Sequence, residues 1–335
     1  MNAPAFRALI PARIDQPAGL PEGDVYKLAG NCMGTTWSVR VVVRDCLSPR
    51  QLQADIAALL EGLEAQMSHF RASSPLRRFA TLPPGCWMDL PAAFAQVMRT
   101  ALKVAHLSEG AFDPALGSVI DAWGFGAAQR FSEAGFAPPA APLLPGRRWQ
   151  ALELDDAGRL RQPGGIALNL AAIAKGFAVD AVAAFLTGRG LDHHLVEVGG
   201  ELRGSGIKPD GQPWWVALES PAQDCPLPAT RVALHGLAVA TSGNYRRCYL
   251  LDERLIQHTL DPRSGEPVTH GLASVTVIHE ECMQADAWAT ALMVLGPQAG
   301  LQRAAAQGLR ALLQWRDERG EWHEAASPAF EALLV

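Results

Sequence analysis

In the N-terminal third of the chain, the spacing of apolar positions changes from that of a strand to that of a helix. Residues 35–43 alternate apolar and polar side chains and are rich in β-branched residues, which predicts a strand. The apolar residues from Leu52 to Met67 then repeat at helical spacing. A second helix is predicted from Pro91, since proline suits a first helical turn, to Gly110. A strand and two amphipathic helices therefore open the ordered part of the chain.

The remaining pattern predicts mostly short strands, with helices in separate blocks. The predicted strands cover residues 166–170, 194–198, 214–219, 239–241, 272–278, 312–315 and 321–323. Helices are predicted over 173–186 and 283–295, and Gly296-Pro297 should begin a further helix. Because short hairpin-like connections link most strands, we expect an α+β fold of mostly antiparallel sheets with packed helices.

Proline content marks the segments that lie outside this pattern. Residues 1–25 are rich in proline and aperiodic, which predicts an extended N-terminal arm. Residues 132–148 are rich in proline and alanine, which predicts a surface excursion. The length of 335 residues allows more than one domain, and a composition of 49% hydrophobic and 19% charged residues is typical of a globular protein.

Charge and cysteine usage exclude several classes of protein. A net charge of −5 provides no basic surface for nucleic acid. The six cysteines are scattered without a C-x-x-C pair, which is typical of reduced thiols and not of a zinc site. The uncharged run over residues 162–174 is too short to span a bilayer, and no signal-peptide-like segment opens the sequence. We therefore expect a cytoplasmic protein without a transmembrane segment, or a periplasmic one if the native N-terminus is longer.

The segment from His258 to Pro267 carries the most concentrated candidate chemistry. Its Asp-Pro and Ser-Gly-Glu-Pro sequences are typical of turns, which would direct His258 and Asp261 toward one site. Asp286 and Thr290 are four positions apart, so on a helix they share one face and offer the hard oxygen ligands that Mg²⁺ prefers. The pattern predicts an acid–base group beside a metal site. The alternative is a polar turn followed by a helix with one exposed face.

Four other segments combine turn residues with groups that could contact a ligand. Met33 beside Gly34 offers a soft surface for a planar ring, or belongs to a loop before a core strand. Phe70 could stack on a ring, or end an ordinary basic helix. Asp113 could accept hydrogen bonds from a ligand, or close its own turn. Lys175 falls in a first helical turn, where the helix dipole disfavours a cation; this indicates a bound anion such as phosphate, or else a solvated side chain.

The order and wording of these motifs resemble one known family. The chain is similar to FAD:protein FMN transferases of the ApbE type over roughly residues 30–296. The matching blocks are Met33–Trp37, Ser68–Phe79, Gly110–Pro114, Trp123–Gly126, Ile173–Gly176, Val196–Leu202, Ala240–Gly243, His258–Pro267 and Ala285–Leu292. The resemblance implies a single α+β domain over residues 26–335. It also implies Mg²⁺-dependent transfer of FMN from FAD to a Thr or Ser hydroxyl of a target protein, through a phosphoester bond and with release of AMP.

The same resemblance implies roles for individual residues. The residues that would contact FAD are Met33, Phe70, Ala111, Phe112, Asp113, Lys175 and Leu260. The residues that would hold Mg²⁺ are Asp286 and Thr290, together with the backbone carbonyl of Ala172 and with Ala289. His258 would help to deprotonate the acceptor hydroxyl, with Asp261 as the alternative. The implied partners are FAD and a flavin-accepting protein, but the sequence identifies neither this protein nor the oligomeric state.

The chain also departs from the family's pattern. Phe70 stands where tyrosine is common, Asn169 replaces a frequent aspartate, and Ala171-Ala172 replace two glycines. Two other functions stay open, and the substitutions at 169–172 suggest the second of them. One is hydrolysis of FAD to FMN and AMP, in which water replaces the protein hydroxyl. The other is FAD binding without catalysis.

Overall fold

The computed structural model describes most of the chain. The described residues are 6–11, 19–44, 48–133, 135–139, 148–223, 225–244, 248–251 and 254–334. Most of the predicted surface excursion at 132–148, and much of the predicted arm at 1–25, lie outside these ranges. Among the described residues, no helix has both the length and the apolar character needed to cross a membrane.

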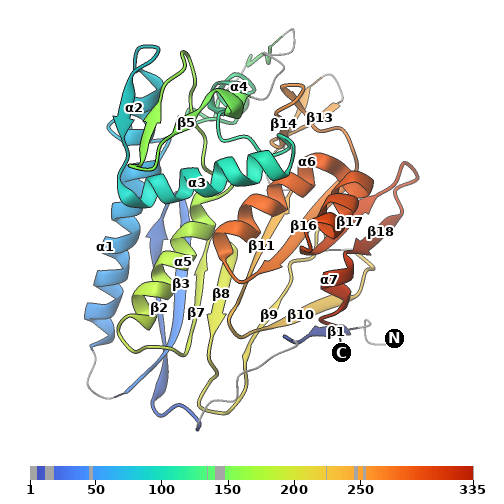
Figure 1. The fold of residues 1–335 in the computed structure, drawn as a ribbon. Coiled ribbons are helices and arrows are strands. Elements are labelled where there is room, and N and C mark those ends of the chain that lie inside the picture. The colour runs from blue at the N-terminus through green and yellow to red at the C-terminus, as the bar shows by residue number, and fades with distance from the viewer. Residues whose placement is uncertain are drawn as a thin grey trace.

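An eight-stranded sheet forms the centre of the molecule (Figure 1). Its strands, in spatial order, are β18 (Trp322–Ala326), β17 (Arg310–Arg316), β16 (Leu272–His279), β11 (Leu237–Gly243), β8 (Glu201–Ser205), β7 (His194–Val198), β3 (Thr35–Val43) and β2 (Asp24–Cys32). Every neighbouring pair in this sheet is antiparallel. The predicted α+β class with mostly antiparallel sheets is therefore confirmed.

Helices cover one face of this sheet, as Figure 1 shows. The long helices are α1 (Pro49–Met67), α3 (Ala92–Leu107), α5 (Ala174–Thr187) and α6 (Cys282–Ala306). Helix α5 packs on β7 and β8, and α6 packs on β11 and β16. The predicted break in the last helix is confirmed, because Gly296 interrupts α6 with a φ of 79°. Helices α5 and α6 therefore lie over the middle strands of the sheet.

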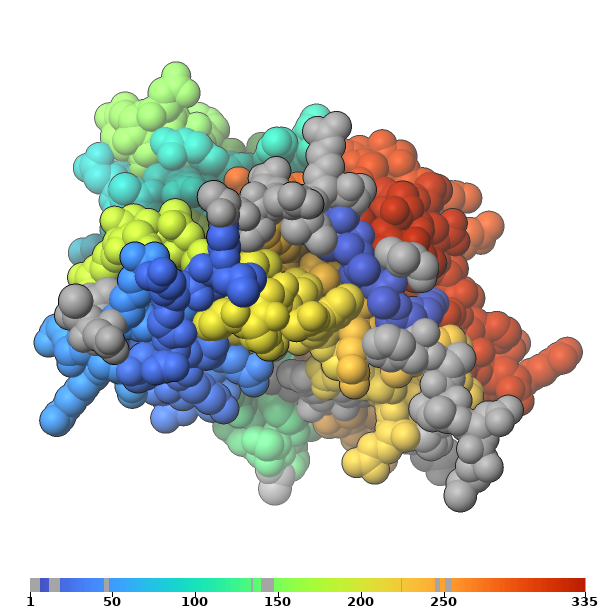
Figure 2. Space-filling view, turned by 90° about the horizontal axis from the view of Figure 1, so that it is seen from below, coloured from blue at the N-terminus to red at the C-terminus, as the bar shows by residue number. Residues whose placement is uncertain are grey.

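A smaller sheet and the C-terminal helix cover the opposite face. This sheet has the order β1 (Phe6–Leu9), β10 (Ala229–Leu234), β9 (Trp214–Ala217), and the helix is α7 (Pro328–Glu331). Figure 2 shows the blue residues of β1 between yellow residues of the smaller sheet and the red C-terminal residues. Successive side chains of a central strand point to opposite faces of the sheet, so one strand contributes to both cores. Val239 packs toward the smaller sheet, whereas Ala238 and Ala240 belong to the core under the helices.

Short elements complete the fold around one end of the central sheet. They are α2 (Pro75–Ala80), α4 (Gly117–Ala122), β4 (Trp87–Asp89), β5 (Glu153–Leu154), β6 (Arg159–Arg161), β12 (Cys248–Leu251), β13 (Arg254–Gln257), β14 (Leu260–Asp261) and β15 (Glu266–Pro267), with 3₁₀ turns at Arg130–Ser132 and Arg148–Ala151. The prediction of a strand over residues 166–170 is wrong. This segment is held by isolated bonds, with the Gly117 amide donating to Ala167 and the Asn169 amide donating to Pro114. Its buried apolar residues produce the strand-like pattern without a partner strand.

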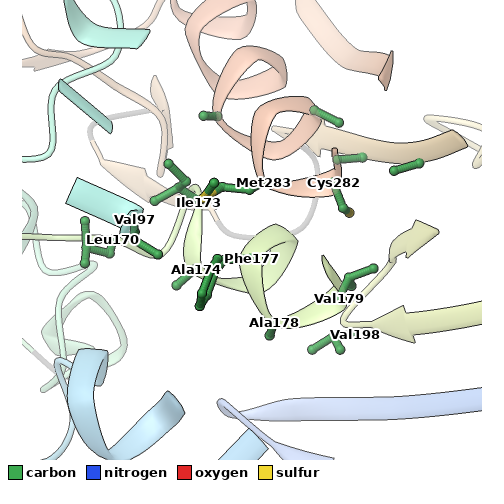
Figure 3. Close-up of a cluster of buried hydrophobic side chains, with 14 of the residues drawn as sticks. Val97, Leu170, Ile173, Ala174, Phe177, Ala178, Val179, Val198, Cys282 and Met283 are labelled. Carbon is green, nitrogen blue, oxygen red and sulfur yellow. The ribbon is translucent and has the colours of Figure 1, made fainter. Parts of the chain in front are cut away.

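Helices α5 and α6 approach each other closely at their first turns. Figure 3 shows the side chains of Ile173 and Met283 gathered between these turns. At Gly176 the approach is so close that a Cβ atom would overlap the carbonyl oxygen of Cys282. A glycine is therefore required where the two helices meet.

This contact predicts a destabilising effect of Gly176→Ala. The added methyl group must push α5 away from α6, and overpacking of this kind costs about 1–3 kcal/mol. The matched control is Gly62→Ala, because Gly62 is exposed on α1 with no atom within 4 Å of a new Cβ. Alanine should stabilise that helix by up to ~1 kcal/mol. Urea unfolding of both variants measures the difference, and an equal effect at the two sites would contradict the close contact.

Candidate active site

A cavity of about 450 Å³ lies where several distant segments meet, and its volume is typical of a ligand site. Its walls come from the β2–β3 turn, the end of α1, the starts of α5 and α6, the end of β11 and the segment 258–262. All of the residues predicted to form the site line this cavity except two. Asp261 and Ala289 are the exceptions. The structure therefore brings together residues that are separated by more than half of the chain.

Three charged side chains form a buried cluster in the cavity wall. Lys175, in the first turn of α5, makes an ion pair with Glu201, the first residue of β8. Asp286, in the second turn of α6, accepts a hydrogen bond of 3.0 Å from the Gly176 amide. Glu201 is only 4% exposed, and its Oε2 atom has no hydrogen-bond partner. In the structure the Lys175 ammonium is paired with a carboxylate of the protein, and the predicted contact with a bound anion such as phosphate stays a prediction.

Burial and mutual charge determine how these groups ionise. Burial raises the pKa of Glu201 to about 7; Lys175 opposes the rise and Asp286 adds to it. Burial also raises the pKa of Asp286. For Lys175, burial alone would lower the pKa, but the carboxylates of Asp286 and Glu201 outweigh it and raise the pKa. Two carboxylates therefore share one ammonium group, and their full ionisation leaves one negative charge to be balanced.

The oxygen donors around Asp286 fit a hard cation. Asp286 and Thr290 lie one turn apart on α6, and both line the cavity together with Ala172. The Thr290 hydroxyl lies 3.1 Å from the hydroxyl of Ser242. In the part of the chain that the structure describes, no group of three or more His, Cys, Asp or Glu side chains could hold a metal ion. A carboxylate, hydroxyls and a backbone carbonyl match the preference of Mg²⁺ and not that of zinc.

The segment that carries His258 is fixed by its neighbours. The Thr259 hydroxyl donates a hydrogen bond of 2.5 Å to the side-chain oxygen of Asn244, and the Thr259 carbonyl accepts one of 3.0 Å from the Val268 amide. The imidazole of His258 lies edge-on to the ring of Phe125, with centroids 6.3 Å apart. These contacts hold His258 in the cavity wall.

Asp261 stabilises the turn that follows His258. Its carboxylate accepts a hydrogen bond of 2.9 Å from the Arg263 amide and makes an ion pair of 2.7 Å with the Arg263 guanidinium. Gly265, with a φ of 75°, closes the turn by donating to the Asp261 carbonyl. Because this carboxylate is engaged within its own turn and does not line the cavity, the position of His258 suits acid–base chemistry better.

Asp113 also closes its own turn while it lines the cavity. Its carboxylate accepts hydrogen bonds from the Ala115 amide at 2.7 Å and the Trp149 amide at 3.2 Å. Burial raises its pKa from 3.8 to about 6, although these two bonds oppose the rise. The turn-closing role of Asp113 is therefore observed, and its contact with a ligand stays a prediction.

Phe70 and Met33 both line the cavity but differ in how exposed their side chains are. Phe70 is 48% exposed, and its ring lies tilted against the ring of His69, with centroids 4.1 Å apart. Met33 is partly buried against the main core in the turn between β2 and β3. Both residues present apolar surface to the cavity, and their contact with a ligand stays a prediction.

Sequence reasoning missed Glu64 and Glu201, which also line the cavity. The block Val196–Leu202 carries the resemblance to the family, but no role is predicted for Glu201 within it. The useful signal was Gly199-Gly200, because both adopt positive φ values and form the tight turn that begins β8 with Glu201. Glu64 carried no signal, since it lies within an ordinary amphipathic helix.

Comparisons with known proteins agree with this geometry. The model of the ApbE family matches residues 33–313. An FAD:protein FMN transferase from Vibrio cholerae is 32% identical over 315 residues, covering 92% of this chain and 92% of the relative. The flavinyl transferase ApbE of Pseudomonas stutzeri, in its apo form, matches with a TM-score of 0.82 and 34% identity, covering 92% of this chain and 96% of its own. The flavin transferase ApbE of Vibrio cholerae matches with a TM-score of 0.80 at 30% identity, covering 93% and 100%.

The fold, the cavity and these similarities define an α+β enzyme of the transferase class. The chain belongs to the ApbE family. The predictions of family, fold and enzyme class are therefore confirmed.

The raised pKa of Asp113 predicts a pH-dependent stability. The folded state holds the Asp113 proton more tightly than the unfolded state, whose pKa is near 3.8. This contribution is fully present below that value and is lost as pH rises through about 6, a difference of up to about 3 kcal/mol. Asp113→Asn should remove this part of the decline. Urea unfolding between about pH 4 and 7 tests the idea, and identical pH slopes for the two proteins would contradict it.

Proposed function

We propose that this protein transfers FMN from FAD to a Thr or Ser hydroxyl of a target protein, forming a phosphoester and releasing AMP. The observation that carries the proposal is that His258, Lys175 and the oxygen donors Asp286 and Thr290 line one cavity. The named relatives act on FAD and protein, and this cavity has groups suited to both substrates. The cytoplasmic location stays a prediction.

The charge of the cavity favours a requirement for a divalent cation. Among the described lining residues, four carboxylates (Glu64, Asp113, Glu201 and Asp286) accompany one lysine. The pyrophosphate of FAD is itself anionic, so it would be repelled unless a cation balanced these charges. Asp286, Thr290 and the Ala172 carbonyl would hold Mg²⁺, which when bound would neutralise charge on the pyrophosphate oxygens.

The residues of this chain then have distinct tasks in the displacement. Lys175, held by Glu201, presents a second positive charge to phosphate oxygens. The acceptor hydroxyl oxygen forms a bond to the flavin-side phosphorus while the bond to the AMP oxygen breaks. His258 takes the hydroxyl proton in this step and passes it to solvent afterwards. Met33, Phe70, Phe112 and Leu260 supply apolar surface for the ring systems of FAD.

The first test is transfer by wild-type protein and by His258→Ala. Both are incubated with FAD, Mg²⁺ and a protein domain that is known to accept phosphoester-linked FMN on a threonine and is prepared without its flavin, and the products are measured by mass spectrometry. The wild type should add one FMN to the domain and release AMP. Loss of the general base should slow transfer by roughly 10²–10⁴-fold.

The control variant is His323→Ala, since His323 is exposed on β18 and bonds Asp317 away from the cavity. It should transfer FMN at the wild-type rate. Free FMN and AMP without an adduct would instead show a pyrophosphatase, and intact FAD would show a binding protein. Full activity of His258→Ala with FAD bound would remove His258 from the mechanism.

The second test concerns the metal. Asp286→Asn removes a metal ligand and one of the two buried carboxylates. We therefore expect the gain in FAD affinity that Mg²⁺ produces to be smaller by roughly 10–100-fold. Flavin fluorescence titrations at several Mg²⁺ concentrations, with a chelator as the zero point, measure it. Asp55→Asn is the control, because Asp55 lies on α1 and pairs with Arg189. An unchanged Mg²⁺ dependence in Asp286→Asn would contradict the assigned ligand.

A further inference from the structure

The turn between β2 and β3 has an unusual backbone for its sequence. Cys32 and Thr35 are paired, so Met33 and Gly34 form a two-residue hairpin turn. Their φ values are 54° and 71°. Such a turn needs a positive φ at both positions. Gly, Asn and Asp adopt this conformation readily, whereas it is unfavourable for residues with long side chains. Methionine is thus held in a disfavoured conformation at a wall of the cavity.

Glu64 is the residue that holds this turn. It extends from the last turn of α1, and its Oε2 atom accepts a hydrogen bond of 2.8 Å from the Met33 amide. The same atom accepts a bond of 3.1 Å from the Cys32 thiol. Burial, strengthened by Glu64, raises the pKa of Cys32 to about 12, so the thiol keeps the proton that it donates. One carboxylate therefore binds two consecutive residues of the hairpin.

The opposite side of Glu64 is also occupied. Its Oε1 atom lies 3.4 Å from the guanidinium of Arg71, which makes a closer ion pair of 2.7 Å with Glu61. The carboxylate is thus surrounded by donors from the protein, which argues against a direct role in binding phosphate. Strained residues persist where surrounding structure fixes them, and they cluster at ligand sites.

We propose that Glu64 is a positioning residue, which holds Met33 in its left-handed conformation and so fixes the Met33 side chain against bound FAD. The proposal rests on the proposed function, because it takes FAD as the ligand of the cavity. It predicts that Glu64 governs FAD affinity and not the rate of the chemical step.

Three variants test this role. Glu64→Ala leaves the Met33 amide without its acceptor, so KM for FAD should rise roughly tenfold while kcat at saturating FAD changes little. Glu64→Gln keeps an oxygen acceptor of the same shape and should recover most of the affinity. Glu61→Ala is the matched control, since Glu61 lies one turn earlier on α1 and shares Arg71 but does not contact the hairpin. Its KM should equal that of the wild type.

A double-mutant cycle separates positioning from general stability. Met33→Gly removes both the strain and the side chain, so adding Glu64→Ala to it should raise KM no further. An equal loss in both backgrounds, a fall in kcat alone, or a wild-type KM in Glu64→Ala would overturn the proposal. If Glu64→Ala does not fold, Glu64→Gln is compared with Met33→Gly. A KM for FAD that is as high in Glu64→Gln as in Met33→Gly overturns the proposal. Failure of the wild type to bind FAD or transfer FMN would instead refute the proposed function.

Discussion

The ion pair between Lys175 and Glu201, with Asp286 beside it, is the interaction on which the rest of the site depends. Asp286 lies beside this pair because α5 and α6 meet so closely that Gly176 has room for no side chain, and the Gly176 amide itself donates to Asp286. Buried charges persist only when they are paired, hydrogen-bonded or balanced by a bound ion. Lys175 can balance one of the two carboxylates, and burial raises the pKa of both, so a proton or a bound cation balances the other. The packing of the two helices therefore determines the charge of the site.

The antiparallel sheet makes this cluster possible by placing distant residues at one end. Glu201 begins β8, whereas Ser242 and Gly243 end the neighbouring antiparallel strand β11. These residues therefore lie together at the same end of the sheet. Helices α5 and α6 begin above the same strands and add Lys175 and Asp286. The segment from His258 to Leu260 closes the cavity through Thr259 and Asn244. Few of these contacts are local, which means that the site exists only in the complete fold.

Local patterns predicted the regular elements, and the resemblance predicted most of the cavity wall. Strand and helix periodicities placed β3, α1, α3, α5 and the break at Gly296 close to their observed positions. The pattern predicted a strand at Ile166–Leu170, where the structure has none. A buried loop and a buried strand both give a short run of apolar residues, so the pattern cannot distinguish them. It also could not show that the anion beside Lys175 is Glu201, or that Asp261 is engaged by Arg263. The first depends on a tertiary contact between α5 and β8, and the second on the conformation that the turn after His258 adopts.

The structure also bears on the substitutions that set this chain apart from the family's common pattern. Ala171 and Ala172 have none of the positive φ values that would require glycine, so the backbone that offers the Ala172 carbonyl is accessible to alanine. Asn169 accepts a hydrogen bond of 3.0 Å from the Ala171 amide through its side-chain oxygen, as an aspartate would, and it adds no charge to a cavity already rich in carboxylates. Phe70 is half-exposed, so the absence of a phenol hydroxyl leaves no buried partner unsatisfied. The backbone and hydrogen bonds at these positions accommodate each substitution, and Asn169 alone lowers the negative charge of the cavity. This favours a working transferase over a protein that only binds FAD.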